Sequence, residues 1–161
     1  MQDLKFLNSK ERRDFLSRLE SLYGFRGDLP GHLLLGGKEK VYLLGDSDLI
    51  REGKDRELRI DRAGIKIGTE SLGGVRLNIE GSQILGPRCS KHVLEIDASH
   101  LGPLVKGEDF LLSDDELSQV KDEKGLFLLR LRGDFLGSAV VKDGKLLNHL
   151  SKNRRVKNLN N

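Results

Sequence analysis

The sequence contains a single cysteine, no tryptophan and only three prolines. One cysteine, Cys89, excludes an intramolecular disulfide framework and a zinc site built from several cysteines. No apolar run approaches the roughly 18 residues that a transmembrane helix needs. Charged residues interrupt the first 16 positions, which argues against a secretory signal. These absences predict a reduced, cytoplasmic, globular protein that has no membrane partner.

Motifs for nucleotide, metal and nucleophile chemistry are also missing. The nearest match to a phosphate-binding Walker loop is Gly36-Gly37-Lys38, which lacks the required spacing and hydroxyl and is better explained as a hairpin turn. The four histidines do not recur at a metal-ligand spacing. We therefore expect no metal, no cofactor, no catalytic residues and no enzymatic activity. A hydrolase would be the competing hypothesis, and it would require His92, Glu95 and Cys89 to converge in a cleft.

Positive charge is concentrated in one short part of the chain. The whole sequence has 28 Lys and Arg against 25 Asp and Glu, a net charge of +3. Residues 142–161 contain six of these cations and one carboxylate, Asp143, so this segment accounts for all of the net positive charge. Clustered cations attract polyanions because each neutralised phosphate releases counterions. A solvated basic tail is the simpler alternative.

Hydrophobic spacing predicts one long helix followed by many short strands. The helix is expected to begin after Asn8, which can form a capping box with Glu11, and to end at Gly24. Two glycines, Gly36 and Gly37, are expected to supply the positive φ angles of a hairpin turn. Strands are predicted at 32–35, 40–44, 58–61, 63–68, 75–79, 83–85, 93–96, 109–112, 126–131, 135–141 and 145–147. A helical turn is predicted through 49–50, a helical segment at 98–105, and an acidic loop or helical turn at 114–120.

This mixture of elements is typical of the α+β class. Gly86-Pro87-Arg88 interrupts the pattern, and we place a domain boundary there. The prediction is a small N-terminal α/β domain over residues 1–86, followed by a second domain over residues 87–161.

The second half resembles a known RNA-binding module. VLEIDASHLGPLVKGEDFLLSDDEL (residues 93–117) is similar to the opening of a PUA domain, in which a short helix ending in glycine, here Gly107, precedes a strand of a small barrel. GLFLLRLRGDFLGSAVVKDGKLLNHLSKNRR (residues 125–155) resembles the PUA-like tail of ribosomal RNA cytosine-C5 methyltransferases of the NOL/NOP/Sun family. The matching features are Gly133, Leu136-Gly137, the segment from Gly144 to Asn148, and a basic end.

The resemblance implies a PUA-like mixed β-barrel that binds RNA. The two-domain plan resembles Nip-type ribosome-biogenesis factors and free-standing archaeal relatives of the methyltransferase tails. The catalytic domain of those methyltransferases, with its Pro-Cys and Thr-Cys motifs, has no counterpart here. The resemblance therefore implies RNA binding without methyl transfer.

A hairpin through Asp143-Gly144 is expected to present the cationic surface. Asn148 would read a base edge or a ribose hydroxyl, and by family analogy Lys106 and Gly107 would form the opposite lip. Because few aromatic residues are available, recognition of the backbone and shape of a structured RNA, such as rRNA or tRNA, is favoured over base stacking. The candidate RNA-binding residues are Lys106, Gly107, Lys142, Lys145, Asn148, His149, Lys152, Arg154 and Arg155.

The expected function is that of a non-catalytic RNA-binding protein in ribosome biogenesis or RNA modification. An RNA-modifying enzyme or a ribosome-assembly factor would be a further partner. The alternative is a protein-interaction adaptor, which would dock a partner such as a separate RNA methyltransferase through the first helix and the acidic segment Asp114–Glu116.

Overall fold

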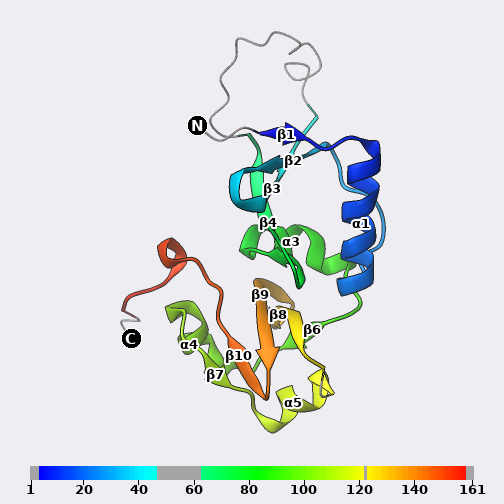
Figure 1. The fold of residues 1–161 in the computed structure, drawn as a ribbon. Helices are drawn as coiled ribbons and strands as arrows, with labels where there is room; N and C mark the ends of the chain where they lie inside the picture. Colours follow the sequence, from blue (N-terminus) through cyan, green and yellow to red (C-terminus); the bar gives the residue numbers. More distant parts are fainter. Residues whose placement is uncertain (1–3, 47–62, 122, 159–161) are drawn as a thin grey trace.

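A computed structural model describes residues 4–46, 63–121 and 123–158 and shows an α+β fold with two five-stranded sheets (Figure 1). The helical turn predicted at 49–50 and the strand predicted at 58–61 lie outside the described residues. Among the described residues, no helix combines the length and apolarity needed to cross a lipid bilayer.

The first sheet is an antiparallel meander, in which each strand pairs with the next one along the chain. Its strands are β1 (Lys5–Phe6), β2 (His32–Gly36), β3 (Lys40–Leu44), β4 (Ile65–Ser71) and β5 (Gly74–Leu77). The predicted hairpin of β2 and β3 is confirmed, but its turn differs from the expectation. The positive φ angles belong to Lys38 and Glu39, at 58° each, and not to the two glycines.

Helix α1 (Ser9–Tyr23) has the predicted ends. Asn8 and Glu11 form the reciprocal capping box, and Gly24 adopts the left-handed conformation at the other end. Phe15, Leu19 and Tyr23 are fully buried at a spacing of four residues, so one face of the helix packs into the core.

Helix α3 (Ile79–Leu85) replaces the strand that we predicted at 83–85, and that prediction was wrong. Asn78 caps the helix, since its Oδ1 accepts a hydrogen bond of 2.7 Å from the Gly81 amide. A Cβ at Gly81 would lie only 1.9 Å from the Ile67 carbonyl oxygen, so this glycine allows the helix to lie directly against β4. A 3-10 turn, η2 (Gly86–Arg88), follows α3.

The second sheet is mixed, with the strand order β6-β8-β9-β10-β7. Strand β6 runs parallel to β8, and all other neighbours are antiparallel. The strands are β6 (Val93–Glu95), β7 (Phe110–Leu111), β8 (Gly125–Leu131), β9 (Asp134–Lys142) and β10 (Lys145–Leu147). The remaining elements are η3 (Ala98–His100), α4 (Leu101–Lys106), α5 (Asp114–Val120) and η4 (Lys152–Arg154). In the described part of the chain β6 and β7 are opposite edges, so the sheet is open and the expected barrel is not confirmed.

One hydrophobic core extends across the predicted domain boundary. It contains Phe15, Tyr23 and Leu85 from the first half together with Leu128 and Phe135 from the second. A second core lies entirely within the second half and is built around Leu94, Leu104, Phe127 and Leu146. The boundary at residue 86 stays a prediction: the two sheets lie on either side of it, but apolar side chains from both sides pack together.

Candidate functional site

A cleft of about 930 Å³ lies where the two sheets meet. Residues of β3, β4 and β5 line one wall, while the first half of β9 and the segment 148–154 line the other. This volume falls within the range of roughly 300–1,000 Å³ that is usual for ligand pockets. We therefore base the candidate site on this cleft.

Three cations project into the cleft from neighbouring strands of the first sheet. Thr69 on β4 pairs with Lys40 on β3 and, on its other side, with Arg76 on β5. Lys66 on β4 pairs with Tyr42 on β3. All five of these residues line the cleft. Since neighbouring strands lie about 4.8 Å apart, Lys40 and Arg76 are separated by two strand spacings, or roughly 10 Å.

These cations are only partly neutralised by the protein. Burial lowers the pKa of Lys66, and the charges of Lys40 and Arg76 lower it further, while Glu80 acts in the opposite direction. Within the residues that the structure describes, neither Lys40 nor Lys66 forms an ion pair. Glu80 is the sole carboxylate on the described lining. The wall thus carries excess positive charge.

The opposite wall contributes His149 and Arg154. Nδ1 of His149 lies 3.1 Å from a guanidinium nitrogen of Arg76, which is a donor, so the imidazole accepts the bond in its neutral form. Burial lowers the pKa of His149, with a further decrease from Arg76 that Asp109 partly offsets. Arg154 pairs with Glu80. These contacts link the segment that follows β10 to β5 and to α3.

Asn148 lines the cleft, but its side chain has a structural role. Its side-chain amide donates to the carbonyls of Leu104 and Glu108, at 2.8 and 3.1 Å, and its Oδ1 accepts from the Leu150 amide at 2.8 Å. These bonds fix the chain as it leaves β10. Reading a base through this amide, as the sequence suggested, would require breaking them.

The other predicted residues do not line the cleft. Lys142 and Lys145 are exposed cross-strand partners at the turn of the β9–β10 hairpin, at the end remote from residues 148–154 (Figure 1). Gly107 ends α4 with a φ of 78°, and a Cβ there would lie 2.2 Å from Nε of Arg155. The side chain of Arg155 therefore packs directly against Gly107. Lys106 and Lys152 are exposed to solvent. The structure brings together His149, Arg154 and Asn148 and separates them from the hairpin lysines.

Sequence reasoning missed Lys40, Lys66 and Arg76. A signal for them was present, because each lies next to a buried strand residue: Val41, Ile67 or Val75. Alternation places such cations on the face opposite the core. The pairing of β3, β4 and β5, which brings these three cations together on one face of the sheet, could not be derived from that alternation.

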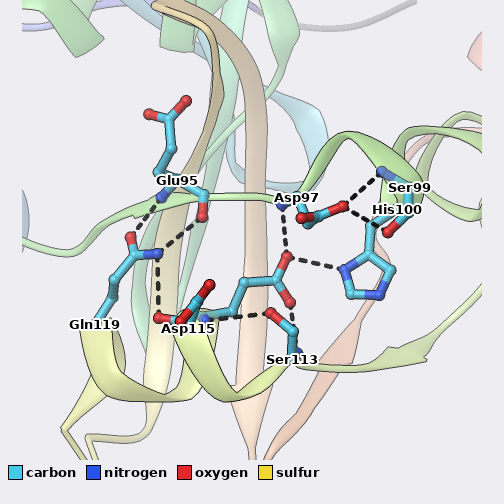
Figure 2. Close-up of polar contacts among 8 residues, drawn as sticks. Glu95, Asp97, Ser99, His100, Ser113, Asp115 and Gln119 are labelled. Carbon is cyan, nitrogen blue, oxygen red and sulfur yellow. Dashed lines mark hydrogen bonds and ion pairs between the residues drawn. The ribbon is translucent and has the colours of Figure 1, made fainter.

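The acidic segment is a helix, and one of its carboxylates is buried. Glu116 is 1% exposed. It accepts hydrogen bonds from the amides of Asp97 and Ser113 and from the His100 ring, at 2.7–2.8 Å (Figure 2). Burial alone would raise the pKa of Glu116, but these bonds outweigh it and lower the pKa overall. Glu116 is therefore unavailable to a partner, which corrects the expectation for Asp114–Glu116; Asp114 and Asp115 remain exposed.

The residues of the hydrolase hypothesis have separate structural partners. His92 pairs with Glu123 and stacks on Phe127. Glu95 pairs with Arg130, while the Cys89 thiol donates to the Leu85 carbonyl at 3.3 Å, and burial raises its pKa to about 11. Across residues 4–46, 63–121 and 123–158, no three His, Cys, Asp or Glu side chains are grouped as metal ligands.

Neither a protein-family model nor a curated protein matches this chain.

Proposed function

We propose that this protein binds RNA through the cleft between its two sheets and acts in ribosome biogenesis or RNA modification without catalysing a reaction. The observation that carries the proposal is the gathering of Lys40, Lys66, Arg76 and Arg154 on one concave lining that contains a single described carboxylate. Arginine and lysine are suited to phosphate oxygens as forked donors and as compact charges.

RNA remains the partner expected from the sequence, but the proposed site is the cleft and not the β9–β10 hairpin. The cationic segment 152–157 supplies Arg154, and the first sheet supplies the other three cations. A PUA-like relationship for residues 87–161, and a modifying enzyme or assembly factor as a further partner, are parts of the same proposal. The order of strand, short helix ending at Gly107 and strand agrees with that relationship, whereas the open sheet does not support the barrel.

The test compares two sets of alanine variants with a structured RNA, measured by fluorescence anisotropy over a salt series. K40A/K66A/R76A should weaken binding and reduce the magnitude of the log–log salt slope by about 0.7–0.9 for each phosphate contact removed. K10A/K91A/K124A removes the same charge from residues outside the cleft and should change both quantities much less. Equal effects of the two sets would overturn the cleft as the RNA site.

The sequence-predicted surface is tested in the same assay. K142A/K145A changes the hairpin turn alone, because neither residue lines the cleft. If that variant weakens binding more than K40A/K66A/R76A does, the hairpin and not the cleft is the main contact.

One observation favours a protein partner as a second candidate. Leu111 on β7 and Leu117 on α5 are 71% and 37% exposed, and the exposed carboxylates of Asp114 and Asp115 lie between them in the sequence. Exposed leucines with acidic neighbours are suited to a basic, amphipathic segment. A protein that stays bound to the wild-type chain after nuclease treatment, and is lost with L111S/L117S, would support the adaptor function.

A further inference from the structure

We infer that the cleft takes an unpaired nucleotide of its RNA, with phosphates at Lys40 and Arg76 and the base against Tyr42. This inference rests on the proposed function and specifies the class of RNA. It differs from recognition of a helical backbone, which the low aromatic content of the chain had favoured.

The first argument is the position of the charges. Lys40, Lys66 and Arg76 are each partly buried on the wall of the cleft, and burial is the largest contribution to the altered pKa of Lys66. A double helix presents its phosphates on a convex outer surface, which suits cations that project from a flat or convex protein face. Cations withdrawn into a cleft are reached more readily by a single strand.

The second argument is the mixture of groups on the lining. Tyr42 provides an aromatic ring directly opposite Lys66 on the neighbouring strand. Ile79 and Leu136 provide apolar surface. Single-stranded RNA is recognised by stacking of unpaired bases on aromatic side chains, combined with cations along the backbone. Tyr42 and Lys66 supply one group of each kind.

The third argument is the presence of polar groups that the fold does not use. The hydroxyls of Tyr42 and Thr69 form no hydrogen bond to another described side chain or backbone group. Thr69 lies between Lys40 and Arg76 in the register of the sheet. A nucleotide whose phosphates contact those two cations would bring its sugar or base edge to these hydroxyls.

The experiment uses three RNAs: a blunt hairpin, the same hairpin with a five-nucleotide single-stranded extension, and the five-nucleotide strand alone. Their affinities for the full chain are measured at one salt concentration. The extended hairpin should bind on the order of tenfold more tightly than the blunt hairpin. Equal affinities would overturn the inference and leave the proposed function intact, whereas failure of all three RNAs to bind would overturn both.

Two variants locate the effect. Y42L should remove most of the difference between the extended and blunt hairpins, while F6L, which changes an aromatic residue that is 44% exposed and lies outside the cleft, should keep it. Because Tyr42 is partly buried, ultraviolet crosslinking of the wild-type protein to the extended hairpin provides a second readout. Crosslinked peptides should include β3 or β4, and crosslinks confined to the β9–β10 hairpin would overturn the inference.

Discussion

The guanidinium of Arg154 pairs with the carboxylate of Glu80, so a residue of the basic segment is held against helix α3. The pair holds this cation beside α3 and partly neutralises its charge there. Both side chains are partly exposed, at 55% and 30%, so the contact contributes little to folding. On the proposed function, its larger effect would be on the charge available in the cleft, because Glu80 would compete with an RNA phosphate for Arg154. Glu80 also attracts Lys66.

Replacing Glu80 with glutamine should therefore strengthen RNA binding. E80Q removes the competing charge and retains a side chain of the same size, so we expect the dissociation constant to fall about two- to fivefold, in keeping with the modest energy of exposed ion pairs. Anisotropy titration measures the change. E108Q removes an exposed carboxylate that does not line the cleft and is the control. Unchanged or weaker binding by E80Q would show that Glu80 does not compete with RNA.

His149 should make RNA binding sensitive to pH. Burial and Arg76 lower its pKa below the usual value of 6.5, so the ring is neutral at pH 7.5 and gains a positive charge only as the pH falls through that lowered value. Protonation adds a cation to the cleft and ends the bond that Nδ1 accepts from Arg76, so the affinity for RNA should rise as the pH falls below 6.5.

H149Q should flatten this dependence. H32Q alters a histidine that does not line the cleft and should retain the wild-type profile. A rise in affinity that is equally steep in H149Q would assign the pH dependence to another group. Titrations at constant ionic strength separate the effect from screening.

The features predicted correctly from the sequence depend on local chemistry. Asn8, Glu11 and Gly24 determine both ends of α1 through contacts within one turn of the helix. The β9–β10 hairpin forms at Asp143-Gly144, whose φ angles are 51° and 73°, as expected of a two-residue turn that requires positive φ at both positions. Such signals need no knowledge of the rest of the fold.

The features that were missed depend on how distant segments pack. The apolar residues at the end of α3 resembled a strand because only seven residues form the helix, too few for a clear helical period. Its position is set by the contact of Gly81 with Ile67. Likewise, Lys66 and Arg76 line the same cleft as Arg154 only because segments from both halves of the chain form its walls. The charge count indicated residues 142–161 alone.

Glu116 should contribute strongly to stability although its neighbours Asp114 and Asp115 are exposed to solvent. E116A removes the buried carboxylate that accepts from the part-buried amides of Asp97 and Ser113, so the free energy of unfolding at pH 7 should fall by about 3 kcal/mol. D115A, which changes an exposed neighbour, should lower the free energy of unfolding much less. Urea denaturation measures both variants.

The pH dependence of this effect has a definite sign. The pKa of Glu116 is lowered in the folded state from its ordinary value of 4.5, so its charge-dependent contribution is fully present above pH 4.5 and is lost as the pH falls through the lowered value. The difference between the wild type and E116Q should therefore decrease in acid. A difference that stays constant from pH 7 to pH 3 would show that the charge of Glu116 does not contribute.

Ser82 should couple the two halves of the chain during unfolding. It is fully buried on α3, and its Oγ accepts a 2.8 Å hydrogen bond from the amide of Gly137 on β9 while donating to the Ile79 carbonyl. S82A leaves the Gly137 amide unsatisfied, which should cost about 1–3 kcal/mol. S118A, which removes an exposed hydroxyl that bonds within α5, is the matched control. Because Phe15 and Tyr23 share a core with Leu128 and Phe135, the loss should shift one cooperative transition of the whole chain. Calorimetry that resolves two transitions, with S82A moving only one of them, would instead support halves that unfold independently.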